Sequence, residues 1–244
     1  MTEAIPTPMP EADSPSATNV FRHRLSTRLW HWTNAVAIFV MLMSGLMIFN
    51  AHPRLYWGHY GANMDAAWLI LPRFPGWATI PSHYNLALAR HWHLATAWVL
   101  AFGLLAYLIW SLVNGHLKKD VALSKAEVAP AHLWDDIKKH AKFDFHSEDA
   151  RYNPLQKITY SLVLFIIIPT AILSGLTLSP GMNAAWPWLV DLFGGRQSAR
   201  SVHFIMAGSV AAFIVVHLAL VIFAGPINEI RSMITGWFRL ETRP

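Results

Sequence analysis

The stretch at residues 202–224, VHFIMAGSVAAFIVVHLALVIFA, decides the fold. It contains no Asp, Glu, Lys or Arg, and about 20 apolar residues are enough to cross the hydrocarbon core of a bilayer. Because no water is available there to bond free N–H and C=O groups, a stretch of this kind has to be helical. The sequence therefore predicts a transmembrane helix over 202–224.

Three further stretches share this character, at residues 29–49, 92–113 and 158–178, and none of them contains a charged side chain. Buried helices of soluble proteins rarely run this long without one charge. The predicted fold class is therefore all-α: an integral membrane four-helix bundle that forms a single domain over residues 21–240.

The composition agrees with a membrane protein. Hydrophobic residues make up 54% of the chain and charged residues only 14%, against about 25% charged residues in soluble domains. There is no Cys, which excludes a disulfide framework, thiolate-bound zinc, an iron–sulfur cluster and the C-x-x-C-H attachment of a c-type haem.

The basic residues predict the orientation. Fourteen of the 19 Lys and Arg lie at 22–28, 118–157 and 231–243. Cytoplasmic loops carry the excess of Lys and Arg, so both termini should be cytoplasmic. The net charge of +5 then needs no nucleic acid as partner.

The remaining segments are predicted to lie outside the bilayer. Residues 1–20 contain four prolines and predict a disordered lead. Residues 50–89 contain Trp57, Trp68 and Trp77 and predict a periplasmic interfacial segment with a short amphipathic helix. Residues 114–157 predict a polar, partly helical cytoplasmic loop.

Four of the 13 histidines lie in or at the mouths of the spans: His31, His93, His203 and His217. An ionisable residue at this depth is a functional hypothesis by default. His203 and His217 are 14 residues apart, which is about 1400° of helix rotation and roughly 21 Å of rise. They therefore share one face of the fourth helix at two depths.

The topology supplies each of these two with a partner. His93 opens the second span from the outside, at the level of His203, and His31 opens the first from the inside, nearer His217. Two pairs at two depths suit two bis-histidine haems. Neutral imidazole is a good axial ligand of haem iron, and without Cys the haem has to be non-covalent haem b.

The pattern R-x-x-H occurs three times, with Arg28, Arg90 and Arg200 three positions before a paired histidine. Positions i and i+3 share a helix face, and arginine binds carboxylates well, so these side chains are predicted to contact haem propionates. The alternative is that they are ordinary snorkelling arginines.

Small residues in the spans would leave room for a porphyrin, although small residues also serve ordinary helix packing. They are Ser44, Gly45, Gly103, Ala106, Gly175, Ala207, Gly208, Ala211 and Ala212. A competing ligand, His91, points about 200° away from His93 on the same helix, so only one of the two can face the iron, and His93 is preferred. The other histidines, at positions 23, 52, 59, 83, 116, 132, 140 and 146, are predicted to be solvated.

Several segments resemble the bacterial di-haem cytochrome b561 superfamily, the b-type cytochrome subunits of hydrogenases, formate dehydrogenases and thiosulfate reductases. These are R-L-W-H-W-T-N at 28–34, R-H-W-H at 90–93 and Y-N-P-L-Q-K at 152–157. The resemblance covers residues 20–240. H-P-R-L-Y-W-G-H-Y-G at 52–61 resembles the branch paired with periplasmic molybdopterin oxidoreductases.

The resemblance implies that His93 and His203 ligate an outer haem and that His31 and His217 ligate an inner one, in agreement with the pairing by depth. It also implies a quinone site near the inner haem, matched here by Asn153, Gln156 and Lys157. Leu155 stands where the family segment has glycine. Asn153 is equally well explained as a helix cap before Pro154.

The function that follows is electron transfer between a periplasmic redox subunit and membrane quinone, with no catalytic residue expected in this chain. Whether the chain is itself an enzyme stays open, because a stand-alone cytochrome that oxidises a small diffusible donor is the alternative. A histidine-lined transporter is a weaker alternative, because the spans lack Asp and Glu, and Pro169, their only interior proline, has no matched counterpart.

Overall fold

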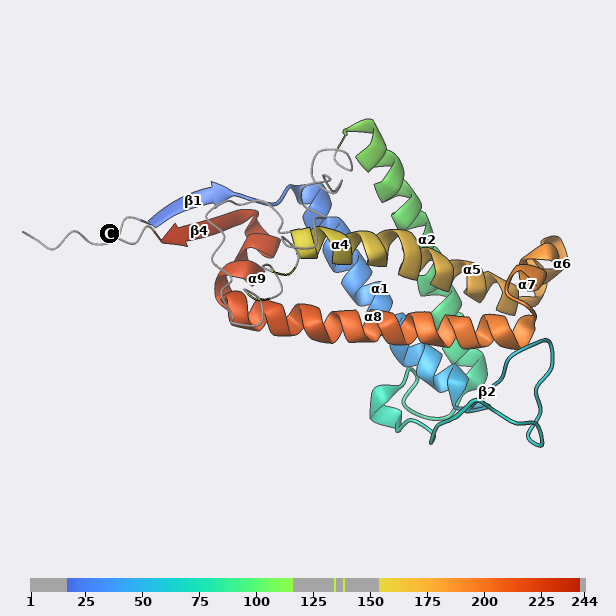
Figure 1. Ribbon diagram of the computed structural model, residues 1–244. Helices are drawn as coiled ribbons and strands as arrows, with labels where there is room; N and C mark the ends of the chain where they lie inside the picture. The colour runs from blue at the N-terminus through green and yellow to red at the C-terminus, as the bar shows by residue number, and fades with distance from the viewer. Residues whose placement is uncertain (1–16, 116–133, 135–137, 139–153, 242–244) are drawn as a thin grey trace, which may run out of the picture.

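The computed structural model describes residues 17–115, 134, 138 and 154–241. Within them, four helices are long and apolar enough to cross a membrane, as predicted: Leu25–Phe49, Leu86–Val113, Leu155–Leu178 and Arg196–Ala224. They are α1 (Leu25–Phe49), α2 (Leu86–Val113), a composite of α4 (Pro154–Leu162), the π-helical turn η3 (Val163–Ile167) and α5 (Ile168–Leu178), and α8 (Arg196–Ala224). The all-α prediction of a four-helix membrane bundle is confirmed (Figure 1).

The spans end at the predicted residues but begin four to six residues earlier than predicted. Each of these added starts contains an arginine or a lysine, at Arg28, Arg90, Lys157 and Arg196, which a purely uncharged window omits. In α2 the side chain of Asn85 accepts a hydrogen bond from the Leu88 N–H at 3.0 Å and caps the helix. At the other end of the bundle, Gly225 ends α8 with a φ of 104°, a conformation that favours glycine.

The spans form two helix pairs, in which α1 packs along α2 and α5 packs along α8 (Figure 1). Between 6% and 22% of the residues in each apolar window are buried. The buried positions are mostly small residues such as Ser44, Ser111 and Ser174, which let helices approach closely. Large side chains such as Leu105 and Val215 are exposed, as lipid-facing residues should be.

The third span contains a local widening. Five residues, Val163–Ile167, form the π-helical turn η3 immediately before Pro169 in α5. Proline has no N–H and its ring collides with the carbonyl of the preceding turn. The π-turn provides the room for that ring while the helix continues in the same direction.

The outer segment after α1 carries two short strands, β2 (Arg54–Leu55) and β3 (Leu69–Ile70), and the 3₁₀ turn η1 (Gly76–Ala78). The predicted amphipathic helix is wrong in this described part of the chain. Prolines at 53, 72, 75 and 81 remove the N–H groups that a helix would need. Two short helices, α6 (Pro180–Ala185) and α7 (Trp188–Leu192), make the other outer connection.

The outer segment is bound to the first turn of α8. The Gly58 carbonyl accepts hydrogen bonds from the N–H groups of Gln197 and Ser198, at 3.0 and 3.1 Å, which pairs N–H groups that a helix terminus leaves free. The indole of Trp68 donates to the Ser201 hydroxyl at 2.9 Å and stacks on Trp57. The outer segment and α8 therefore form one rigid contact.

At the inner side, β1 (Ala17–Phe21) pairs antiparallel with β4 (Trp237–Glu241), next to α9 (Pro226–Thr235). We call β1, α9 and β4 the inner clasp. The predicted disordered lead is wrong for residues 17–20, which belong to β1 and pair with β4 as far as Glu241. Residues 1–16 lie outside the described residues. The partner of β1 lies at the far end of the sequence, so no local sequence pattern predicts this pairing.

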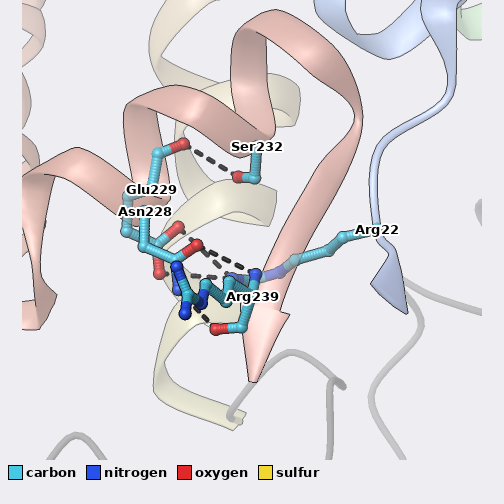
Figure 2. A network of polar contacts seen from close by, with 5 residues as sticks. All are labelled: Arg22, Asn228, Glu229, Ser232 and Arg239. Atoms are coloured by element: carbon cyan, nitrogen blue, oxygen red, sulfur yellow. Dashed lines mark hydrogen bonds and ion pairs between the residues drawn. The ribbon is translucent and has the colours of Figure 1, made fainter. Parts of the chain in front are cut away.

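Polar contacts hold the inner clasp together (Figure 2). Arg22 forms an ion pair with Glu229 at 3.2 Å. The side chain of Asn228 donates to the Arg239 carbonyl at 2.7 Å and accepts from its N–H at 2.9 Å. The Ser232 hydroxyl donates to the Glu229 carbonyl at 2.8 Å. These contacts join both ends of the described chain into one unit.

The inner clasp is fixed to the beginning of α1. The Arg28 guanidinium donates to the Ile234 carbonyl, and the Trp32 indole donates to the Met233 carbonyl at 3.1 Å. Both side chains flank His31 in the sequence. The end of α9 therefore lies against the turn of α1 that carries this histidine.

His23, between β1 and α1, should make the inner clasp sensitive to pH. Burial, together with the charges of Arg22, His31 and Arg28, lowers the pKa of His23 to about 4. Below about pH 6.5 the unfolded segment binds a proton that the folded one does not, so stability should fall as the pH drops from about 6.5 to about 4. We expect the hydrogen-exchange protection factors of β1 and β4 to fall when the pH is lowered from 7.5 to 5.5.

The matched variant is His23→Gln, which keeps a polar side chain without a titrating group in this range. Its protection factors should be nearly constant over the same interval. An equal loss of protection in the variant would contradict the assignment to His23.

Candidate functional site

The four histidines of the spans meet in two pairs. The ring centroids of His93 in α2 and His203 in α8 are 6.0 Å apart, and those of His31 in α1 and His217 in α8 are 6.3 Å apart. We call them the outer pair and the inner pair. The structure thus brings together the same partners that the sequence assigns to each depth.

Both separations fit a metal held between two imidazoles. Metal–imidazole bonds are about 2 Å long. Each ring nitrogen lies roughly 1 Å from its ring centroid, so two imidazoles on opposite sides of one metal have centroids about 6 Å apart. Rings in direct stacking contact would be closer. The two pairs therefore have the spacing of axial ligands.

The outer pair also has the tautomer that a ligand needs. His93 Nδ1 lies 3.0 Å from the Met41 carbonyl, and His203 Nδ1 lies 2.8 Å from the Ala171 carbonyl. A carbonyl only accepts, so each Nδ1 carries the hydrogen and donates it. Each Nε2 is left unprotonated and able to bind iron, the arrangement that metal-bound histidines usually have.

Glycines make room for the outer pair. A Cβ added to Gly45 would lie 3.4 Å from His93 Cε1, and one added to Gly175 would lie 3.0 Å from His203 Cε1. Gly175 therefore makes room for an imidazole, and Gly45 lies in ordinary contact with one, where the sequence predicted room for a porphyrin. Gly103 likewise makes room for the indole of Trp30, whereas Gly208 faces open space.

The inner pair lies among aromatic side chains. Phe213 stacks on His217 with centroids 5.7 Å apart, and Trp32 meets His31 edge-on at 5.1 Å. In the described part of the chain, the buried atoms His31 Nδ1 and Arg28 Nε have no hydrogen-bond partner. Buried polar atoms are rarely left unpaired, so these two indicate a group that is bound here.

The three arginines predicted to contact propionates lie in different surroundings. Arg200 donates to the carbonyls of His52 and Arg54, and Arg28 donates to the inner clasp. Arg90 is exposed. Arg28 and Arg200 thus anchor the segments next to the two pairs, and their contact with propionates stays a prediction.

His52 is a residue that the sequence analysis assigned to solvent. Its ring stacks on Tyr56 at 5.7 Å, and its Nε2 is enclosed without a partner in the described structure. Burial, with the nearby charges of Arg200 and Arg54, lowers the pKa of His52. It is therefore a neutral polar group at the outer end of α8, beside Arg200.

The sequence analysis also missed the roles of Ser44 and Ser174. Their hydroxyls lie 3.2 and 3.3 Å from the Nδ1 atoms of His93 and His203. A signal was present, because M-L-M-S-G-L at 41–46 and A-I-L-S-G-L at 171–176 are similar.

Of the other site residues, His91 is exposed and lies outside both pairs, and the choice of His93 as the ligand stays a prediction. Gln156 and Lys157, predicted near a quinone, lie in α4 at the inner end of the third span. Asn153 and most of the predicted cytoplasmic loop lie outside the described residues.

Comparison with known proteins now gives the family. The model of the family described as prokaryotic cytochrome b561 matches residues 22–236. The chain belongs to this family. It is therefore a multi-pass membrane cytochrome that binds haem b and takes part in electron transfer.

Relatives have names of the same kind. The cytochrome is 31% identical over 198 residues, 80% of this chain and 86% of the relative, to the putative protein-methionine-sulfoxide reductase subunit YedZ1 of Azospira oryzae. It is 24% identical over 240 residues, 90% and 88% of the two chains, to the probable Ni/Fe-hydrogenase B-type cytochrome subunit of Azotobacter vinelandii. No solved structure matches.

Proposed function

We propose that this cytochrome conducts electrons across a bacterial inner membrane, between an oxidoreductase at the outer face and the quinone pool, through two haems b. The proposal rests on the outer and inner histidine pairs, whose ring centroids are 6.0 and 6.3 Å apart, respectively. His203 and His217 place them on one face of α8, about 21 Å apart along the helix. That spacing divides the membrane crossing into two shorter steps.

The residues present fit haem b at both levels. His93 and His203 would be the axial ligands of the outer haem, and His31 and His217 those of the inner one. Bound haem supplies one-electron chemistry between the ferric and ferrous states of its iron. The chain holds the ring planes, excludes water with its apolar spans, and offers Arg28, Arg90 and Arg200 for the propionates.

If two histidines hold each haem, neither metal would offer a free position to oxygen or another substrate. The chain then contributes positions and surroundings for electron transfer, and chemistry at a substrate belongs to its partners. This is why we expect it to act as the electron-transfer subunit of a larger oxidoreductase.

The partner at the outer face is proposed to be a periplasmic oxidoreductase of the molybdopterin class. The segment at 52–61 supports the choice by its resemblance to that branch. The names of the relatives also support a redox enzyme as partner, since they denote subunits of a methionine-sulfoxide reductase and a hydrogenase. Trp77, whose side chain is 82% exposed on the outer segment, offers an aromatic contact of the kind that interfaces favour.

Quinone is proposed to bind at the inner side, near Asn153, Gln156 and Lys157. Gln156 and Lys157 lie in the first turns of α4, on the side of the membrane that holds the inner pair. An electron that moves fully across a potential of 100 mV changes its energy by about 2.3 kcal/mol. The direction of flow therefore depends on the potential of the partner enzyme.

The test is haem quantitation on the purified chain, followed by reaction with a quinol. We expect two haems b per chain, a reduced-minus-oxidised spectrum of b type, and reduction by a short-chain ubiquinol or menaquinol. A colourless protein, or one haem per chain, would overturn the two-haem proposal. Rapid reduction by a small donor at the outer face without a partner would favour the stand-alone alternative.

A further inference from the structure

The two helix pairs hold the outer imidazoles with the same device. In the first pair, α2 supplies His93 and α1 supplies the groups around its Nδ1. These are the Met41 carbonyl at 3.0 Å and the Ser44 hydroxyl at 3.2 Å. Ser44 is fully buried, so water does not compete for its hydroxyl.

The second helix pair repeats the arrangement. Here α8 supplies His203 and α5 supplies the Ala171 carbonyl at 2.8 Å and the Ser174 hydroxyl at 3.3 Å. As in the first pair, the serine stands three positions after the residue whose carbonyl accepts the bond and directly before a glycine. It is also fully buried. Two similar stretches of sequence on different helices thus surround the two rings in the same way.

The orientation of the serine hydroxyls follows from their other contacts. Ser44 Oγ donates to the Val40 carbonyl at 2.6 Å, and Ser174 Oγ donates to the Thr170 carbonyl at 2.7 Å. A hydroxyl has one hydrogen, so the oxygen that faces Nδ1 acts as an acceptor. Each Nδ1–H of the outer pair is therefore shared between a carbonyl and a serine oxygen.

The inner pair is built differently. His31 Nδ1 is buried and has no hydrogen-bond partner within the described residues, and its neighbours are the aromatic rings of Trp32 and, through His217, Phe213. Acceptors at Nδ1–H make an imidazole a stronger donor at Nε2. The outer ligands are thus more electron-rich than His31.

We propose that Ser44 and Ser174 are positioning residues that fix the outer imidazoles and make the outer haem the one with the lower potential. The inference rests on the two-haem function proposed above. Stronger axial donors stabilise ferric over ferrous iron, which lowers the reduction potential. The resulting gradient favours electron transfer from the outer to the inner site.

The test is an optical redox titration of the purified holoprotein, with Ser44→Ala, Ser174→Ala and the double variant. We expect the midpoint potential of the low-potential component to rise and the midpoint potential of the high-potential component to stay constant. At a fixed ambient potential, the ferric-to-ferrous ratio of the low-potential component should fall about tenfold in the double variant. This is the lower end of the effects that hydrogen bonds to metal ligands have on metal sites. The low-spin ferric electron-paramagnetic-resonance signal of that component should shift with it.

Two matched variants separate hydrogen bonding from packing. Ser209→Ala removes a serine of α8 that donates to the Ile205 carbonyl at 2.9 Å in the same way but has no histidine beside it, so both components should stay unchanged. Ser44→Cys fills almost the same volume with a weak acceptor and should behave like Ser44→Ala. A Cys variant that titrates like the original protein, while the Ala variant shifts, would overturn the inference.

The failure of this inference is distinct from the failure of the proposed function. One haem per chain and a single titrating component in the unmodified protein would refute the two-haem function. Two components whose midpoint potentials are the same in all serine variants as in the original protein would refute only the role of Ser44 and Ser174. A shift confined to the high-potential component would likewise overturn the inference, because it would assign the serines to the wrong haem.

Discussion

Replacement of His203 by Ala is expected to lower the haem content from two haems b per chain to one. His203 is the better held of the two outer ligands, with its Nδ1 2.8 Å from the Ala171 carbonyl. Its loss leaves His93 alone on one side of the outer site and opens a cavity on the other. The inner pair, on the same helix but about 21 Å away, should keep its haem.

The measurement is haem extraction and quantitation per purified chain, together with a topology reporter at the carboxyl terminus. The helix should still insert, because its apolar window has the highest hydropathy of the four spans. The control is His91→Ala, which removes an exposed histidine from α2 and should keep both haems. Retention of both haems in the His203 variant would refute this ligand assignment.

A second large effect is expected from Gly175→Val. A Cβ at this position would lie 3.0 Å from His203 Cε1 and 3.3 Å from its Nδ1, and the two methyl groups of valine extend further. The imidazole would have to move away from the Ala171 carbonyl. Overpacking of this kind typically costs about 1–3 kcal/mol, which corresponds to about a five- to 150-fold weaker outer site.

The same haem assay, with and without a competing apo-protein that removes loosely bound haem, measures this loss. Gly45→Ala is the milder comparison, because its Cβ would meet His93 Cε1 at 3.4 Å, an ordinary contact distance. Its haem content should remain close to that of the original protein. Gly181→Val places the same side chain where nothing lies within 4 Å. If all three variants bound haem alike, the glycine would have no role in placing the ligand.

The spans and the histidine pairs were predictable from sequence because both depend on local regularities. A run of 23 uncharged residues at 202–224 and a spacing of 14 between His203 and His217 are direct consequences of helix geometry and bilayer thickness. The two rings on α8 could be assigned to depths before any partner was known.

Other features depend on contacts between distant segments and leave no such regularity. The pairing of β1 with β4 joins residues at opposite ends of the sequence, so β1 was grouped with the proline-rich stretch that precedes it. Ser44 and Ser174 each look like small residues for helix packing, and only the neighbouring helix shows that they face an imidazole. The outer segment has tryptophans typical of an interfacial helix, but its prolines select short strands and turns.

The inner clasp has a consequence for the order of assembly in the cell. β1 is synthesised before the first span and β4 after the fourth, so the two strands can meet only once all four helices have left the ribosome and entered the bilayer. Because α9 lies against the turn of α1 that carries His31, that turn gains its contacts with α9 only after the fourth span has been made. The surroundings of His31 are therefore completed only when the last part of the chain has been synthesised.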